Sequence, residues 1–338
     1  MKNLRLLLTV ALLFGGISFA VAQTSPPRDG TIVEQLPCAV NPISTYEQYV
    51  ESSKRKYAEE LEAAKRAGQA LQTPLAYMSK EEFGRENDAS KIECRRIKYL
   101  SDGLKVVGFI WRPKDMGSKK LPLIIFNRGG NREFAKLTPG HGIQQFALEG
   151  FVVIASQYRG NDGGEGLEEF GGADVHDVLN LVPLAESLGY VDMKNIFMLG
   201  WSRGGMMAFL ALKNNIAVNA VAVGGCPTNM VSESKKRPGS VANIFRPLIP
   251  GYDTHAEESL RERSSIFWSE RINVPVLIMH GGADPRVAPS EALFLAQKLQ
   301  EQGKTYELVV YAGDDHAISM NKTDSNRRIV EWFRKYMK

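Results

Sequence analysis

A serine, an aspartate and a histidine occur in this sequence in the order and the local settings that nucleophilic catalysis requires. Ser202 lies in a G-x-S-x-G pattern at residues 200–204. An apolar run at 196–199 precedes the pattern, and a helix-compatible run at 206–212 follows it. A strand, a glycine-hinged turn and a helix around a serine predict a nucleophile elbow, which exposes the hydroxyl at the edge of a sheet. The alternative is an ordinary glycine turn that matches the pattern by chance.

Two later loops supply candidates for the acid and the base. Asp284 follows the apolar run 275–279, which is typical of a buried strand. His316 follows the next strand candidate, at 306–311, in the equivalent position one unit later. The order serine, acid, histidine is that of α/β hydrolases. We expect His316 to take the serine proton and return it to the leaving group, while Asp284 fixes the tautomer of His316.

Other polar residues of these loops remain alternatives. Asp314 or Asp315 could orient the histidine in place of Asp284, although both are close to it in sequence, which makes the geometry awkward. His280 ends a strand beside a Gly-Gly turn and is expected to be packed or bonded to its own loop. The histidines without a strand-end context are interpreted as structural or solvent-facing, and these are His141, His176 and His255.

The negative oxygen of a tetrahedral intermediate needs two preorganised N–H donors. One is predicted to be the backbone N–H of Arg203, the residue after the nucleophile. The other is expected from the segment after the strand candidate 123–126. There the backbone of Arg128, Gly129 and Gly130 is favoured, because paired glycines let a main chain approach a substrate carbonyl. Which N–H donates stays open, and a Gly-Gly turn that only connects two segments is the alternative.

Three arginines near these donors indicate a possible clamp for an acidic group of the substrate. Arg128 and Arg203 belong to the donor segments, and Arg159 lies on the neighbouring loop. Guanidinium groups bind carboxylates through paired hydrogen bonds. Trp201, beside the nucleophile, is a further candidate for substrate contact. The alternative is structural, with Arg159 bonded to backbone and Arg203 paired with an acid. The candidate acids are Asp162, Glu165 and Asp174.

With these motifs in view, the stretch from about residue 92 onward resembles the catalytic domain of the prolyl oligopeptidase (S9) family of serine peptidases, a branch of the α/β hydrolases. The matching segments are 158–164, 200–205, 280–287 and 313–316. The resemblance implies a serine hydrolase that works without a metal or an organic cofactor. We expect no β-propeller, because the roughly ninety residues before the hydrolase pattern show no strand repeat and are too few to build one. Peptidase specificity is therefore not carried over.

The remaining sequence predicts the elements that position these residues. Residues 92–100 and 104–111 are typical of an antiparallel hairpin. From residue 123 onward strands and helices alternate, which predicts an α/β-hydrolase fold with a mainly parallel eight-stranded sheet and helices on both faces. A catalytic domain at 91–338 then contains a cap-like insert at 227–274. A cap would select the substrate, and a surface excursion without substrate contact is the alternative.

The amino terminus indicates export. Lys2 and Arg5 precede an apolar run at 6–14, and small residues precede a cleavage point after Ala22. This pattern predicts a signal peptide at 1–22, and a retained membrane anchor is the alternative. We expect a periplasmic or secreted protein with no stable membrane span after cleavage.

An N-terminal helical extension is expected at 23–90, where residues 45–84 are rich in Glu, Lys, Ala and Leu. It is interpreted as one or two surface helices, and a partner-binding arm is the alternative. Export would permit one disulfide, for which Cys38 and Cys94 are the only plausible pair, because Cys226 ends an apolar run and is expected to be buried. Whether this bridge forms stays open.

Composition excludes one class of partner. The net charge of +4, of which the signal contributes two, gives no basic footprint for nucleic acid. The sequence therefore predicts an exported serine hydrolase that forms an acyl-enzyme on Ser202 and acts on a short peptide or a small-molecule ester. The alternatives are a carboxylesterase for small or acidic acyl esters, and a non-catalytic binding module with a hydrolase shell.

Overall fold

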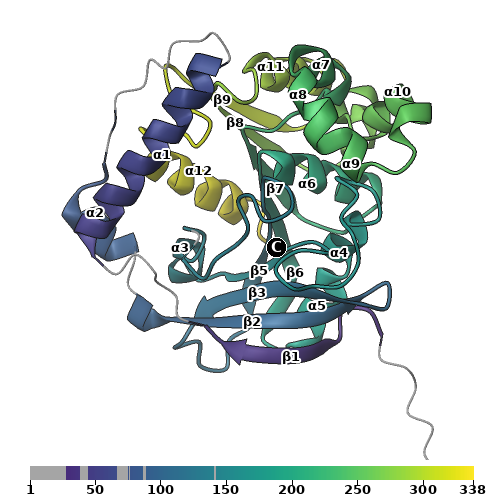
Figure 1. Ribbon diagram of the computed structural model, residues 1–338. Helices are drawn as coiled ribbons and strands as arrows, with labels where there is room; N and C mark the ends of the chain where they lie inside the picture. Colours follow the sequence, from purple (N-terminus) through teal and green to yellow (C-terminus); the bar gives the residue numbers. More distant parts are fainter. Residues whose placement is uncertain (1–27, 39–44, 67–74, 76, 87–88, 141) are drawn as a thin grey trace, which may run out of the picture.

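The computed structural model of the chain (Figure 1) describes residues 28–38, 45–66, 75, 77–86, 89–140 and 142–338. The predicted signal peptide and His141 lie outside these residues. The strands are β1 (Ile32–Pro37), β2 (Ile92–Ser101), β3 (Leu104–Pro113), β4 (Leu121–Asn127), β5 (Val152–Ser156), β6 (Val191–Trp201), β7 (Ala220–Gly224), β8 (Val276–Gly281) and β9 (Tyr306–Tyr311). The helices are α1 (Tyr46–Arg66), α2 (Lys80–Glu86), α3 (Gln145–Leu148), α4 (Val175–Leu179), α5 (Leu181–Ser187), α6 (Arg203–Lys213), α7 (Met230–Lys236), α8 (Pro238–Ser240), α9 (Arg246–Leu248), α10 (Tyr252–Glu262), α11 (Ser290–Glu301) and α12 (Lys322–Lys335). Single turns are η1 (Ala89–Lys91), η2 (Val241–Phe245), η3 (Ser265–Phe267) and η4 (Ser269–Arg271).

One sheet joins the nine strands of the described chain in the order β1-β2-β3-β5-β4-β6-β7-β8-β9. The six strands β5, β4, β6, β7, β8 and β9 are parallel to one another, and at the other edge β1, β2, β3 and β5 pair antiparallel in that order. The predicted hairpin is present as β2 and β3, whose turn pairs Ser101 with Leu104. Because the carboxyl ends of parallel strands share one edge, the loops after β4, β6, β8 and β9 gather there.

The predicted number of eight strands is wrong by one. The additional strand, β1, comes from the extension that was expected to be helical, and it pairs antiparallel with β2. All of its residues after Ile32 are exposed. A short edge strand without a buried face has no alternation of apolar and polar residues that sequence reasoning could detect. The extension also contains helices α1 and α2, where Tyr46 and Tyr49 pack around Phe83.

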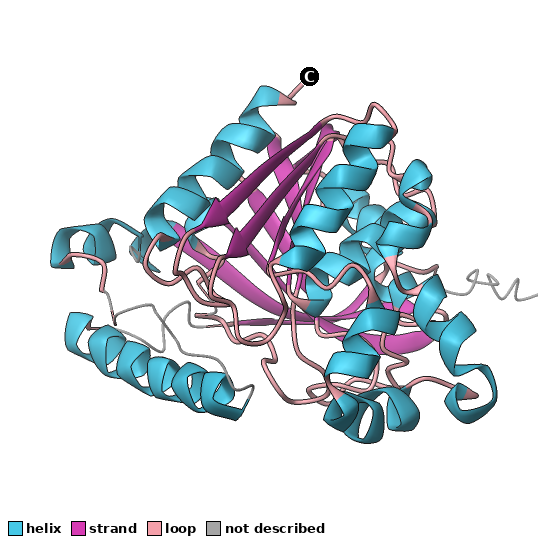
Figure 2. Ribbon diagram, turned by 90° about the horizontal axis from the view of Figure 1, so that it is seen from above, coloured by secondary structure: helices cyan, strands magenta, loops and turns pink. Residues whose placement is uncertain are grey.

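Both faces of the central parallel strands are buried, as the fully buried β5 and β7 show. In β4, Leu123 and Ile125 belong to one apolar cluster, whereas Ile124 and Phe126 belong to the other. Helices α4, α5, α6, α10 and α11 complete the first cluster, and α3 and α12 complete the second. Figure 2 shows these helices on the two sides of the sheet. Strands buried on both faces are continuous apolar runs, which made them recognisable in the sequence.

The insert between β7 and β8 is a set of short helices from α7 to η4. They gather at the upper right of Figure 1, beside the carboxyl edge of the sheet. Where β1 pairs with β2, at the antiparallel side of the sheet, Cys38 and Cys94 form a disulfide with a Cα–Cα distance of 5.2 Å. Cys226 is a free cysteine and is buried. Within the described ranges, no helix has the length and apolar character needed to cross a membrane.

Candidate active site

Ser202 occupies the sharp corner between β6 and α6. Its backbone is left-handed, with φ 55° and ψ −127°, which is a strained conformation for a residue with a side chain. The flanking glycines make the corner possible. A Cβ on Gly200 would lie 2.3 Å from the carbonyl oxygen of Gly204, and a Cβ on Gly204 would lie 1.9 Å from the carbonyl oxygen of Asn127. The strand, turn and helix predicted around the G-x-S-x-G pattern are all present.

Asp284 and His316 meet at the same edge of the sheet. The loops after β8 and β9 bring His316 Nδ1 to 2.7 Å from Asp284 Oδ2. The other carboxylate oxygen, Oδ1, accepts the backbone N–H groups of Arg286 and Val287 at 2.8 and 2.9 Å. The carboxylate is therefore fixed by its own loop and presents one oxygen to the imidazole.

The charge state of Asp284 follows from this environment. Burial by itself raises the pKa of the Asp284 carboxyl. The charge of His316 and the hydrogen bonds from His280 and His316 lower this pKa by more than burial raises it, so it lies well below its usual range. A carboxylate only accepts hydrogen bonds, so the proton of neutral His316 sits on Nδ1. Nε2 is then the unprotonated, basic nitrogen of the ring, which is the tautomer that a general base next to a serine requires.

His280 contacts Asp284 as well as its own loop. Its Nε2 lies 2.9 Å from the carbonyl oxygen of Val287 and 3.1 Å from Asp284 Oδ2. The loop bonding agrees with the prediction, whereas the contact with Asp284 was not anticipated. A histidine four residues before an acid, at the end of the same strand, is the signal that could have indicated it. Of the other histidines that the structure describes, His176 pairs with Asp102 and His255 is exposed.

The alternative acids are engaged elsewhere. Asp314 accepts hydrogen bonds from the backbone N–H groups of Asp315, Met320 and Asn321. Asp315 accepts those of Ala317 and Ser319. Both side chains shape the loop that carries the histidine, and Asp284 is the acid whose carboxylate contacts His316 Nδ1.

Two glycines at the end of β7 bring the serine and histidine loops together. Gly224 accepts the N–H of Ser202 at 2.8 Å, and its missing side chain leaves room for the indole of Trp201. A Cβ on Gly225 would lie 3.0 Å from two atoms of the His316 ring. The indole N–H of Trp201 donates to the carbonyl oxygen of His316 at 2.9 Å. Trp201, expected at the substrate, therefore binds the histidine loop to the elbow.

Gly129 is the residue of the expected oxyanion segment that lies against the nucleophile. A Cβ on it would be 3.1 Å from Ser202 Cβ and 3.7 Å from Ser202 Oγ. Gly130 has a φ of 67°, and a Cβ there would lie 2.2 Å from the carbonyl oxygen of Phe134. Only glycine fits at Gly130, and a side chain at Gly129 would crowd Ser202, so the main chain of this segment can approach a substrate at Ser202.

The hypothesis of an arginine clamp is wrong for all three side chains, because they are buried and bonded inside the protein. Arg128 donates to the carbonyl oxygens of Gln157, Gly129, Phe134 and Arg132. Arg159 pairs with Asp177 and Asp102. The structural alternative holds in kind, although these partners differ from the backbone bonding that was expected for Arg159.

Arg203 confirms one of the predicted acid partners and adds another. Its guanidinium lies 2.5 Å from Asp174 and 3.0 Å from Glu168, and all three side chains are at most 3% exposed. Of the other candidate acids, Asp162 pairs with Arg96 and Lys136. Glu168 was missed because nothing in its sequence context distinguishes it from a surface glutamate.

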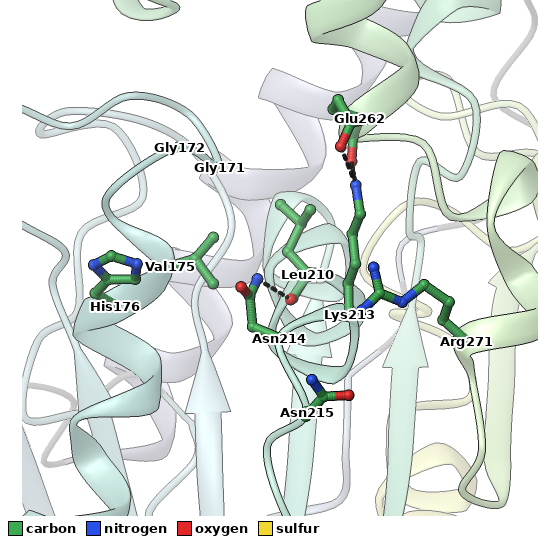
Figure 3. Close-up of a pocket in the computed structure, with 10 residues that line it drawn as sticks. All are labelled: Gly171, Gly172, Val175, His176, Leu210, Lys213, Asn214, Asn215, Glu262 and Arg271. Atoms are coloured by element: carbon green, nitrogen blue, oxygen red, sulfur yellow. Dashed lines mark hydrogen bonds and ion pairs between the residues drawn. The ribbon is translucent and has the colours of Figure 1, made fainter.

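Two cavities in the described part of the chain lie near the elements of the site. One, of about 680 Å³ and open to solvent, lies between the insert and the loops after β4 and β5, with Arg132, Glu168 and Tyr252 in its wall. The other, of about 370 Å³, lies at the carboxyl end of α6, where Lys213 pairs with Glu262 (Figure 3). An eleven-residue helix is about 16 Å long, so the second cavity is remote from Ser202. No group of His, Cys, Asp or Glu in the described part of the chain is arranged to hold a metal ion.

Comparisons with known proteins agree with this geometry. A sequence model described as the prolyl oligopeptidase family matches residues 138–338, which contain the serine, the acid and the histidine. The chain is 32% identical over 244 residues to the uncharacterized peptidase YtmA of Bacillus subtilis (strain 168), covering 72% of this chain and 92% of that protein. It is 26% identical over 348 residues to the uncharacterized peptidase YuxL of the same organism, covering 94% of this chain and 52% of that protein.

Solved structures show the same fold at lower identity. An acylaminoacyl peptidase in complex with Z-Gly-Gly-Phe-chloromethyl ketone matches with a TM-score of 0.64 and 22% identity, over 73% of this chain and 42% of that one. The uncomplexed acylaminoacyl peptidase of Pyrococcus horikoshii matches with a TM-score of 0.65 and 20% identity, over 77% and 44%. The chain thus spans less than half of either protein. These likenesses confirm the predicted α/β-hydrolase fold class.

Proposed function

The chain belongs to the prolyl oligopeptidase family of serine peptidases, and we propose that it cleaves short peptides through an acyl-enzyme on Ser202, with His316 as the base and Asp284 as the orienting acid. The observation that carries this proposal is the hydrogen bond between His316 Nδ1 and Asp284 Oδ2, on loops that Trp201 and Gly224 join to the nucleophile elbow.

The reaction proceeds in two balanced halves. Ser202 Oγ attacks the carbonyl carbon, its proton passes to His316 Nε2, and the carbonyl π electrons move to the oxygen. Collapse of this intermediate breaks the C–N bond, and the leaving amine takes the proton from His316. Water then attacks the acyl-enzyme with the same base, which releases the acid and restores the serine. Backbone N–H groups of Arg203 and of the segment at Gly129 and Gly130 stabilise the oxyanion in both halves.

The insert is proposed to select the substrate. Its helices form one wall of the 680 Å³ cavity, and Arg132, in the opposite wall, is only three residues from Gly129 at the nucleophile. Pockets of this volume accommodate ligands of the size of a short peptide. The acylaminoacyl peptidase structure contains a peptide-like chloromethyl ketone, which supports a peptide as the substrate class here.

We also propose that the protein is exported. The sequence at 1–22 has the features of a signal peptide, and the disulfide between Cys38 and Cys94 supports an oxidising compartment, where such bridges persist. Expression with residues 1–22 present, followed by amino-terminal sequencing of protein from the periplasm and the medium, tests this. Protein that stays in the cytoplasm with its first residues intact would contradict export.

Labelling with a fluorophosphonate probe tests the nucleophile. We expect the mature chain to be labelled and the Ser202→Ala variant to be silent. Ser187→Ala is the matched control, because its hydroxyl caps α5 by bonding Leu184 and lies outside the site. Labelling that survives Ser202→Ala would refute the assignment. Turnover of proline- or alanine-linked peptides relative to p-nitrophenyl esters separates a peptidase from an esterase, because only the poor leaving amine needs protonation by His316.

A further inference from the structure

Three consecutive carbonyl groups of the segment beside Ser202 are each held by a different buried side chain. Tyr158 Oη donates to the carbonyl oxygen of Arg128 at 3.0 Å. Arg128 Nη1 donates to that of Gly129 at 3.1 Å. Arg203 Nη1 donates to that of Gly130, also at 3.1 Å. We propose that Tyr158 and Arg128 are positioning residues that aim the N–H groups of Gly129 and Gly130 at the substrate oxyanion, and that Arg203 is a positioning residue that holds the end of the same segment in place through the carbonyl of Gly130.

Peptide geometry turns the fixed carbonyls into fixed donors. In a trans peptide the C=O and the following N–H point in opposite directions, and the described chain has no cis peptide bond. The carbonyl of Arg128 faces the hydroxyl of Tyr158, so the N–H of Gly129 faces away from it. The same holds for the carbonyl of Gly129 and the N–H of Gly130. Gly129 lies against Ser202, so the segment is close enough for these N–H groups to serve a substrate bound at the nucleophile.

The positioning side chains are themselves rigidly held. The guanidinium of Arg203 lies 4.9 Å from the ring centroid of Tyr158 and 4.6 Å from that of Phe170. Its partners are Asp174 and Glu168, and Glu168 also accepts the backbone N–H of Arg132 at 3.0 Å. Aromatic rings and carboxylates on opposite sides of a buried guanidinium leave it little freedom. The cluster thus connects the residue after the nucleophile with both ends of the oxyanion segment.

Tyr158 shows two further signs of a constrained role. Its backbone has a φ of 64°, which is costly for a bulky side chain and persists only where the surroundings impose it. Burial raises the pKa of its hydroxyl far above the usual value, so the group remains a hydrogen-bond donor throughout the working pH range. No titration of Tyr158 can then release the carbonyl of Arg128 during turnover.

The test compares Tyr158→Phe with Tyr99→Phe. Tyr99 is equally buried, and its hydroxyl bonds the backbone carbonyl of Asp177 at 2.7 Å and Ser156 Oγ at 2.8 Å, neither of which belongs to the oxyanion segment. The inference rests on the proposed function, so the substrate is p-nitrophenyl butyrate, and the transition-state probe is a trifluoromethyl ketone analogue of N-acetylalanine, which forms an oxyanion when serine adds to it.

For Tyr158→Phe we expect kcat to fall and the inhibition constant of the ketone to rise by the same factor, about 3- to 10-fold, as for the loss of one buried hydrogen bond. KM should change less than twofold, because the oxyanion contact forms only in the transition state. Tyr99→Phe should keep kcat and the inhibition constant while losing similar thermal stability. Equal kinetic losses in both variants, or none in Tyr158→Phe, would overturn the inference.

A second pair of variants covers the case in which Tyr158→Phe does not fold. Arg203→Lys keeps a positive charge between Asp174 and Glu168 but removes the guanidinium nitrogen that donates to the carbonyl of Gly130. We expect the same loss of kcat and of ketone affinity. Arg263→Lys is its control, because Arg263 is also buried and donates to the carbonyl oxygens of Phe170 and Glu169 instead. An unchanged ketone affinity in Arg203→Lys would contradict the proposal. A wild-type chain without activity would overturn the proposed function and this inference together, whereas active wild type with unaffected variants would overturn the inference alone.

Discussion

Removal of the bridge between Cys38 and Cys94 should destabilise the protein without changing its turnover. The two cysteines are 56 residues apart in sequence. In the chain-entropy description, a cross-link that closes a loop of this length lowers the entropy of the unfolded chain by an amount equivalent to about 4 kcal/mol at 25 °C. For a chain of 338 residues that unfolds in one step, this corresponds to a fall in Tm of about 6 °C.

Activity should be unaffected because of where the bridge lies in the sheet. Cys94 is on β2, and the order of strands places β3, β5 and β4 between it and β6, which ends at the nucleophile elbow. At about 4.8 Å per strand, the two strands are about 19 Å apart. Any local change in β1 on removal of the bridge should therefore leave the geometry at Ser202 unchanged while the protein is folded.

The assay uses the double variant Cys38→Ser/Cys94→Ser and the wild-type protein with and without a phosphine reductant. Urea titration followed by circular dichroism gives the free energy of unfolding, and ester hydrolysis in the absence of urea gives kcat. Cys226 is common to all samples, so it does not contribute to the difference. Identical urea midpoints for the variant and the oxidised wild type would refute the stabilising bridge. A large fall of kcat without urea would refute the separation of this edge from the site.

Three further predictions concern charged groups. Asp284→Asn should lower kcat about 10⁴-fold with little change in KM, because the amide favours the wrong tautomer of His316, and steady-state kinetics measure it. Burial raises the pKa of Glu233 most, and the negative charge of Glu291 adds to this, so that the pKa is about 7. The native state therefore binds a proton there that the unfolded chain releases above about pH 4.5. Stability should therefore fall by about 2 kcal/mol between pH 5 and pH 8, and Glu233→Gln should abolish this fall in urea titrations at the two pH values. Arg203→Ala should lower the free energy of unfolding by about 3–5 kcal/mol, because two buried acids lose their partner. It should also reduce the turnover of neutral and anionic esters by the same factor. A selective loss of anionic esters would restore the clamp hypothesis.

The sequence located the strands of the parallel half and the loops at their carboxyl ends. Runs such as Leu123 to Phe126 are apolar on both faces, so their type and approximate position did not depend on the rest of the fold. The glycines of the elbow were equally informative, because collisions at Gly200 and Gly204 depend only on the local turn. By contrast, β1 is recognisable only through its pairing with β2, and its exposed residues give no pattern.

The arginines show what a motif does not determine. Proximity in sequence to the oxyanion segment made Arg128 and Arg203 candidates for the site, but it did not give the direction of their side chains. Direction is decided by burial, because a guanidinium that faces inward needs acceptors inside the protein. Here backbone carbonyls, Glu168 and Asp174 accept from the terminal nitrogens of the two guanidinium groups. These acceptors come from other loops, so the sequence near the serine carries no record of them.

The contact between the serine and histidine loops has the same character. Trp201 and His316 are 115 residues apart, and their hydrogen bond exists only because Gly224 and Gly225 leave space for both rings at the end of β7. Strands β6, β7 and β9 end near this point. In the sheet β6 and β7 are neighbours and only β8 separates β7 from β9, whereas in sequence whole helices lie between them. Gly224 and Gly225 thus leave space at the end of β7 for side chains from the elbow and from the histidine loop. At Gly225 even one methyl group would have to displace the imidazole that Asp284 holds.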